Sequence, residues 1–144
     1  MVPGLDRERV TKHLEDISSS LRILESLKPV SFQQFSEDPK IYWAVEKGLE
    51  RCIQNLLDAS AHIVAALGGP VPDNYGSLLL ELGRSRILPS DFAARIAPMA
   101  GFRNILIHEY LEVDLREVYA ALQDRLDDFR TFAHYVLRFL EANS

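Results

Sequence analysis

The chain has 144 residues, of which 47% are apolar and 26% charged, and this composition predicts one soluble domain, residues 1–144, large enough to bury a core. The net charge of −5 argues against a broad basic surface, so DNA binding is not expected, although a small local phosphate site is compatible with it. Its one cysteine excludes an internal disulfide, and no apolar run approaches the ~18 residues that cross a bilayer, so we expect a cytoplasmic protein.

The first half of the chain predicts two long helices. Apolar residues recur in steps of three and four over residues 5–28, which places them on one face of a helix. Residues 31–38 predict a connector with room for a short turn of helix. Asp38 and Pro39 have the pattern of an N-cap followed by proline, and they begin a helix over 39–67. The core face of this second helix is predicted to hold Val45, Leu49, Cys52, Ile53, Leu56, Ile63, Val64 and Leu67.

The second half predicts a loop and three further helices. Residues 68–76 hold three glycines and two prolines, which indicates a loop. A short helix is expected over 77–86, with Leu78, Leu79 and Leu82 facing inward. A helix over 91–109 should kink or restart near Pro98, because proline disrupts a helix interior.

One final helix is expected to start at Asp114 and to run to about residue 141. No window of the chain alternates apolar and polar residues for long, as a strand exposed on one face would. The sequence therefore predicts an all-α fold, namely an up-down helical bundle of four main helices with one or two short helices.

The most informative residues lie in the segment 103–110. Arg103 is followed five residues later by His108 and two residues further by Tyr110, inside an otherwise apolar stretch. Arginine is a permanent, forked cation that suits phosphate, and histidine can give and take a proton near neutral pH. A tyrosine hydroxyl can accept a transferred group. In a chain of this composition, chance gives the triplet roughly 0.01 times.

One straight helix does not aim Arg103 and His108 at the same phosphate. Side chains turn by about 100° per residue, so these two lie roughly 140° apart, whereas Asn104 and His108 share a face. Two arrangements would bring the arginine and the histidine together. In the first, the helix ends near His108 and frees its side chain; in the second, two copies of the helix face each other across a two-fold axis. We favour the second arrangement, alone or combined with the first.

This motif resembles the Arg-x4-His-x-Tyr motif of HepT-like proteins, a branch of the HEPN superfamily. Further stretches agree with that family: Asp-Ala-Ser-Ala-His-Ile at 58–63 is similar to its Asp-x-x-x-His-Ile pattern. The loop 72–75, the run 99–102 and the start of the last helix at 113–118 are also similar. The resemblance covers residues 40–140, which is most of the chain.

The resemblance implies a HEPN-like bundle that forms a homodimer through its motif helices. It also implies a metal-independent endoribonuclease toxin of a type VII-like toxin–antitoxin pair. Arg103 and His108 would be the catalytic residues that cleave RNA, and Asn104 would support them by orienting His108 or binding a phosphate oxygen. Tyr110 would accept AMP from a nucleotidyltransferase antitoxin, which silences the nuclease. The antitoxin would use ATP, so this chain would need no cofactor and no metal.

A different class of function remains open. The chain could be a non-catalytic dimeric subunit that binds a nucleotide or a substrate for a minimal nucleotidyltransferase, and the acidic balance is compatible with that role. A purely structural bundle would tolerate changes at all three motif positions. Outside the motif, we expect Asp58 and His62 to form a hydrogen-bonded pair and Tyr75 to pack its loop on the bundle. Three arginines could line an RNA path, although solvated faces are their commoner fate: Arg84, Arg86 and Arg95.

Overall fold

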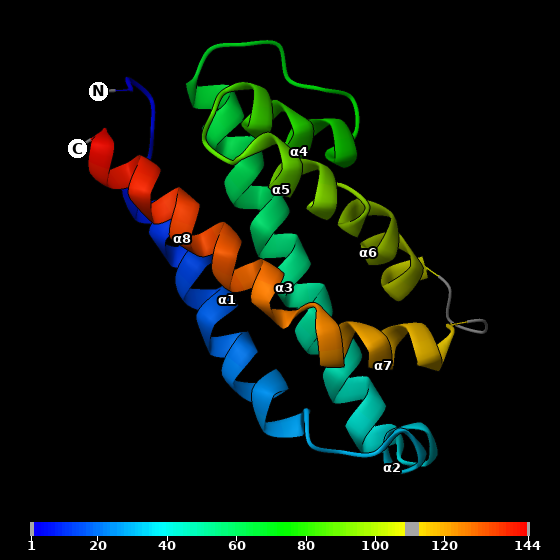
Figure 1. The fold of residues 1–144 in the computed structure, drawn as a ribbon. Coiled ribbons are helices and arrows are strands. Elements are labelled where there is room, and N and C mark those ends of the chain that lie inside the picture. Colours follow the sequence, from blue (N-terminus) through cyan, green and yellow to red (C-terminus); the bar gives the residue numbers. More distant parts are fainter. Residues whose placement is uncertain (1, 109–112, 144) are drawn as a thin grey trace.

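The computed structural model describes residues 2–108 and 113–143, and within these ranges the chain forms eight helices and no strand. The all-α prediction is therefore confirmed. The helices are more numerous than expected because the two helices predicted for the last third of the chain are each divided. In Figure 1, α1 (Arg7–Leu27) and α3 (Pro39–Ala66) lie side by side and run in opposite directions, and α8 (Leu126–Ala142) packs against both.

Of the two long helices, the second begins at the predicted residue, and the first begins two residues later than predicted. Helix α1 (Arg7–Leu27) starts after Asp6, whose side chain accepts a hydrogen bond from the backbone N–H of Arg9. Helix α3 (Pro39–Ala66) starts with proline after Asp38, which accepts from the N–H of Lys40. The predicted core face of α3 is buried except at its last member, Leu67, where the prediction is wrong. That residue is 39% exposed because the helix ends one residue earlier.

A glycine brings α1 and α3 into close contact. A Cβ atom on Gly48 would lie 2.7 Å from Cδ2 and 2.9 Å from Cγ of Leu24, nearer than carbon atoms can pack. Glycine costs helix stability, but here its missing side chain lets the two longest helices approach. In the sequence, α2 (Phe32–Glu37) lies between α1 and α3 and occupies the predicted connector. It begins with a capping box made by Ser31 and Gln34.

The middle of the chain forms three short helices, α4 (Tyr75–Arg84), α5 (Ser90–Ile96) and α6 (Met99–His108). Helix α4 begins two residues earlier than expected because the Asn74 side chain accepts from the N–H of Ser77 at 2.8 Å. The three leucines that were predicted to face inward, Leu78, Leu79 and Leu82, are buried. The chain restarts near Pro98, also as predicted, so that α6 takes a direction different from that of α5.

The single final helix was a wrong prediction. The chain instead forms α7 (Leu115–Asp124) and α8 (Leu126–Ala142), which are separated at Arg125. Neither glycine nor proline marks the break, and the apolar spacing continues through it. The two halves follow different neighbours: α7 packs on α2 and α3, whereas α8 packs on α1 and α3. Tyr119 and Gln123 of α7 also donate hydrogen bonds to the carbonyls of Val30 and Lys28, each at 2.7 Å. These tertiary contacts outweigh local helix propensity.

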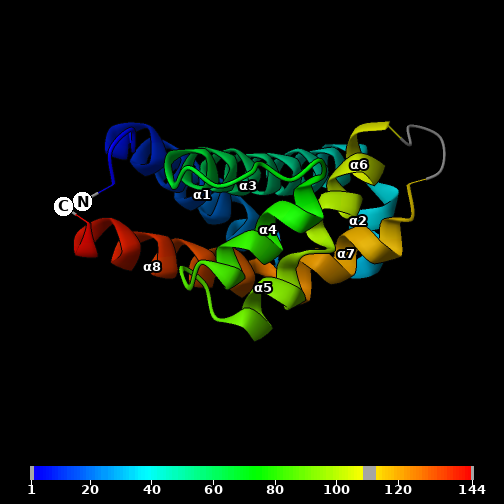
Figure 2. The same ribbon diagram turned by 90° about the horizontal axis from the view of Figure 1, so that it is seen from above.

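Viewed from above in Figure 2, α1 and α3 form one layer, and α8, α5 and α7 form a second. The start of α1 and the end of α8 lie at the same end of the molecule, where the Arg7 guanidinium donates to the carbonyl of Leu140. Helix α6 and the start of α7 lie at the other end. Among the described residues, no helix combines the length and the hydropathy that a bilayer crossing requires.

Candidate active site

The candidate site lies on α6, which packs across α3 and also contacts α4. Phe102 and Leu106 are partly buried against the core and hold the helix in place. Arg103 lies between them in the sequence and is half-buried, whereas its neighbour Asn104 is exposed. The apolar residues of α6 therefore fix the backbone from which the guanidinium projects, as a phosphate site requires.

Arg103 is held by three side chains from three helices. Its Nε donates to Oε1 of Gln54 on α3 at 2.7 Å, and its Nη1 donates to Oδ1 of Asn104 at 3.0 Å. Tyr75, the first residue of α4, places its ring 5.8 Å from the guanidinium carbon. Tyr75 is thus more than the loop-packing residue that the sequence suggested. Asn104 contacts the predicted catalytic arginine.

Within the described part of the chain, the partners of Arg103 are electrically neutral. Five other arginines of the described chain pair with carboxylates, and their charges are largely compensated: Arg51, Arg84, Arg95, Arg125 and Arg130. Arg103 instead meets two amide oxygens and an aromatic ring. These contacts fix the orientation of the guanidinium group without compensating its positive charge. A guanidinium in that state is well suited to bind an anion.

A carboxylate, that of Asp58, contacts Gln54 on the side away from Arg103. Nε2 of Gln54 donates to Oδ1 of Asp58 at 2.8 Å, one helical turn further along α3. The predicted pair of Asp58 with His62 is wrong, because each has another partner. The Nε2 atom of His62 accepts the backbone N–H of Asp6 at 2.8 Å, next to the start of α1. The spacing of Asp58 and His62 on one helix allows the pair. The amide of Gln54 and the backbone N–H of Asp6 instead provide their hydrogen-bond partners.

The other two motif residues lie at or beyond the edge of the described chain. The backbone of His108 belongs to α6, but its side chain lies outside the described residues, and so does Tyr110. The catalytic role of His108 and the acceptor role of Tyr110 therefore stay predictions. So does the convergence of Arg103 and His108 on one phosphate.

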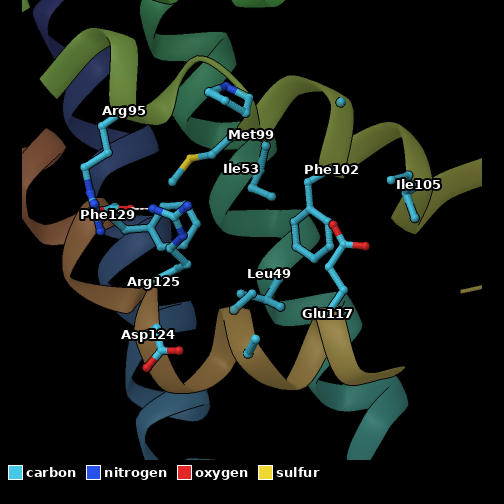
Figure 3. A pocket seen from close by; sticks show the side chains of 15 residues that line it. Leu49, Ile53, Arg95, Met99, Phe102, Ile105, Glu117, Asp124, Arg125 and Phe129 are labelled. Atoms are coloured by element: carbon cyan, nitrogen blue, oxygen red, sulfur yellow. Dashed lines mark hydrogen bonds and ion pairs between the residues drawn. The ribbon is translucent and has the colours of Figure 1, made fainter. Parts of the chain in front are cut away.

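The opposite flank of α6 borders a cavity of about 530 Å³. Phe102 and Ile105 of α6 line it together with Met99, Leu49 and Phe129, and charged side chains stand at its edge (Figure 3). Asp128, whose side chain is 8% exposed, accepts from Arg95 at 2.9 Å and from Arg125 at 3.2 Å. Arg95 and Arg84 thus belong to ion pairs, which makes them poor candidates for the predicted RNA path.

Cys52 and possible metal ligands were the other candidates for chemistry outside the motif. Cys52 is fully buried, and burial raises the pKa of its thiol to about 12, so the packing role expected from the sequence is confirmed. Within residues 2–108 and 113–143, no group of three His, Cys, Asp or Glu side chains is arranged to hold a metal ion.

Comparison with known proteins gives the family of this helical bundle. A model of the family "Ribonuclease HepT-like" matches residues 17–136. The chain belongs to this family, so the resemblance noted in the sequence is confirmed.

Two curated relatives share most of their length with this chain. A tRNA nuclease HepT of Aphanizomenon flos-aquae is 26% identical over 131 residues, which cover 91% of this chain and 89% of that protein. An mRNA nuclease HepT of Shewanella oneidensis is 27% identical over 99 residues, covering 69% and 74% of the two chains.

Solved structures show the same fold. A tri-AMPylated HEPN toxin of Shewanella oneidensis in complex with an MNT antitoxin superposes with a TM-score of 0.83 at 21% identity, covering 92% of this chain and 99% of that chain. YutE, a cytosolic Bacillus subtilis protein of unknown function, superposes with a TM-score of 0.85 at 17% identity, covering 97% and 94%.

Proposed function

We propose that this chain is a metal-independent endoribonuclease in which Arg103 and His108 cleave RNA. Membership of the ribonuclease HepT-like family supports the activity, as do the two relatives that are named as a tRNA nuclease and an mRNA nuclease. The observation that carries the assignment of Arg103 is its setting. It is the arginine of the motif helix, and neutral groups hold it so that its charge remains available.

The chemistry needs only groups that this chain and its substrate supply. RNA carries its own nucleophile, the 2′-hydroxyl. His108 would take the 2′-hydroxyl proton as a new bond forms between O2′ and phosphorus. The bond between phosphorus and O5′ breaks, and the leaving oxygen would receive a proton from protonated His108, since an imidazole can act as general acid as well as base. Arg103 would stabilise the charge that grows on the phosphoryl oxygens, and no metal or other cofactor is needed.

The same site suggests how the nuclease is controlled. We propose that Tyr110 accepts AMP from a nucleotidyltransferase antitoxin that uses ATP, making this chain a toxin of a cytoplasmic type VII-like toxin–antitoxin pair. The tri-AMPylated toxin solved with its MNT antitoxin supports this proposal. An AMP group two residues from His108 would bring a bulky anion beside both catalytic groups. It would block the cleft and pair with Arg103.

A homodimer is also part of the proposal. Arg103 and His108 are five residues apart on one helix, and side chains at that spacing point roughly 140° away from each other. Two copies of α6 facing each other across a two-fold axis would place an arginine and a histidine on the same phosphate.

The test is a nuclease assay on total cellular RNA with EDTA present. The purified protein is compared with Arg103→Ala and His108→Ala, after mass spectrometry has verified that Tyr110 carries no AMP. We expect cleavage by the parent and a loss of at least about a hundredfold in each variant, since each removes a group that acts in the transition state.

The controls separate the alternatives. Arg84→Ala changes an arginine that is paired with Glu81, and it should leave cleavage unchanged. Absence of cleavage by the unmodified parent would contradict the nuclease and favour a non-catalytic subunit of the nucleotidyltransferase. Equal cleavage by the parent and both motif variants would place the activity elsewhere.

A further inference from the structure

We propose that Gln54 is a positioning residue for catalysis and that it acts as a neutral tether that aims the guanidinium of Arg103. The inference rests on the proposed nuclease function, because the orientation of Arg103 matters only if that side chain meets a phosphate. Gln54 lies on α3, 49 residues away in the sequence and outside the recognised motif.

The hydrogen bonds leave one edge of Arg103 available. Gln54 occupies Nε and Asn104 occupies Nη1. No described residue accepts a hydrogen bond from Nη2. Tyr75, 38% exposed, lies 5.8 Å from the guanidinium carbon and limits how the plane can tilt. The guanidinium is therefore fixed at two nitrogens and along one face, and Nη2 remains for an incoming anion.

Asp58 sets the orientation of the glutamine amide. A carboxylate only accepts hydrogen bonds, so the amide group that lies 2.8 Å from Asp58 must be the donating NH₂. The amide oxygen of Gln54 must then face Arg103, whose nitrogens only donate. The two hydrogen bonds that link Arg103 to Gln54 and Gln54 to Asp58 therefore have only one consistent donor–acceptor arrangement. Reversing the amide would oppose acceptor to acceptor at one end and donor to donor at the other.

The neutrality of the tether follows from its task. A glutamate in place of Gln54 could accept the same hydrogen bond from Nε, as Asp128 does from Arg95 in this chain. It would also compensate the positive charge and weaken the attraction for phosphoryl oxygens. The negative charge of Asp58 lies one helical turn beyond Gln54. There it orients the glutamine amide without contacting the guanidinium.

Two substitutions separate the hydrogen bond from the charge. Gln54→Met keeps the length of the side chain and removes the acceptor, whereas Gln54→Glu keeps the acceptor and adds a charge. The matched control is Gln33→Glu in α2. Gln33 also donates to a carboxylate four residues later, Glu37, but lies far from Arg103 in the sequence and on another helix. It reproduces the like-charge pair that Gln54→Glu creates with Asp58.

The kinetic readout is cleavage of a fluorogenic RNA oligonucleotide, with kcat and KM measured separately. We expect both Gln54 variants to lower kcat roughly tenfold or more and to change KM less than about threefold, because the aimed charge acts mainly in the transition state. The Gln33→Glu variant should keep the parent kcat. A purely structural role would instead lower the melting temperature and leave the kcat of the folded fraction unchanged.

A second readout does not require nuclease activity. The Nε–H group of Arg103 should give a slowly exchanging NMR signal in the parent, identified by its loss in Arg103→Lys. It should exchange rapidly in Gln54→Met. If the parent cleaves no RNA but this difference is observed, the proposed function fails and the tether stands. Unchanged exchange in Gln54→Met would overturn the tether, and full kcat in Gln54→Glu would overturn its required neutrality.

Discussion

Arg51 and Arg103 show two different uses of arginine in this chain. Between α1 and α3, Arg51 donates to Asp16 at 2.6 Å, and Asn55 donates to the same carboxylate. His13 approaches Oδ1 of Asn55 to 2.8 Å, so the network ties the two helices together. There the cation is compensated and contributes to stability. At Arg103 the partners among the described residues are neutral, and its charge is not compensated by them.

The Asp16 network makes stability depend on pH. The hydrogen bond from Arg51, followed by that from Asn55, lowers the pKa of Asp16 below its ordinary value of 3.8 despite partial burial. A carboxyl with a lowered pKa contributes stability above its ordinary value, and this contribution is lost as the pH falls through the folded-state pKa. Asp16→Asn should therefore cost about 0.5–1 kcal/mol at pH 7, a small value because Arg51 is largely exposed.

The measurement is urea unfolding of parent and Asp16→Asn at pH 7 and at pH 3. The difference should shrink at the lower pH. Glu8→Gln is the control, since it removes the same charge from the same helix where the partner, Lys12, is highly exposed. A difference between parent and Asp16→Asn that is the same at both pH values would contradict the assignment.

The sequence could predict the motif residues of the site but not their surroundings. Arg103 was recognisable because its spacing to His108 and Tyr110 is rare. Gln54 and Tyr75 gave no comparable signal, because each becomes relevant only when α3 and α4 pack beside α6. Helical periodicity shows which face of a helix is buried. It does not show which other helix lies against that face.

At the scale of elements, a boundary was predictable where local chemistry marked it, as at Asp38 and Pro39 before α3. Asp6 and Asn74 also cap their helices with side chains that accept backbone hydrogen bonds, but the sequence placed the start of α1 two residues too early and that of α4 two residues too late. The break at Arg125 was not predictable, since it results from the different neighbours of α7 and α8 rather than from a local signal.

Two helical glycines should respond in opposite ways to the same change. Gly48→Ala places a methyl group against Leu24 in the buried α1–α3 contact and should destabilise the fold by about 1–3 kcal/mol. Gly101→Ala in α6 meets no atom within 4 Å and should stabilise the fold by about 0.5–1 kcal/mol, because alanine loses less backbone entropy. Thermal unfolding followed by circular dichroism measures both. A shift of the same sign in both variants would contradict this account.

At the scale of the whole molecule, the proposed cleft at the end that carries α6 would draw on two copies of the chain. Arg103 projects from a helix that is anchored on α3 and α4, and its direction is fixed. A histidine on the same helix five residues later points elsewhere unless the backbone departs from a helix or a second copy contributes.

Mixing two inactive variants tests the arrangement with a second copy. Arg103→Ala and His108→Ala are mixed in equal amounts under mild denaturant, so that their subunits exchange. Half of the resulting dimers contain one subunit of each variant, and each such dimer has one intact cleft of two. The mixture should therefore recover about a quarter of the parent activity. Analytical ultracentrifugation should show a mass twice that of the 16.3 kDa chain. A monomeric protein, or a mixture as inactive as its components, would contradict a shared cleft.

The hydrogen bond from Arg7 to the carbonyl of Leu140 brings the beginning of α1 and the end of α8 together at the end of the molecule opposite α6. A short linker could therefore join these two helices. The order of the helices along the sequence could then be changed without changing their arrangement in space. New termini opened in the glycine- and proline-rich segment 68–74, which precedes α4, would leave α3 and α6 intact. In such a circular permutant the tether residue and the motif arginine would exchange their sequence order while keeping their contact.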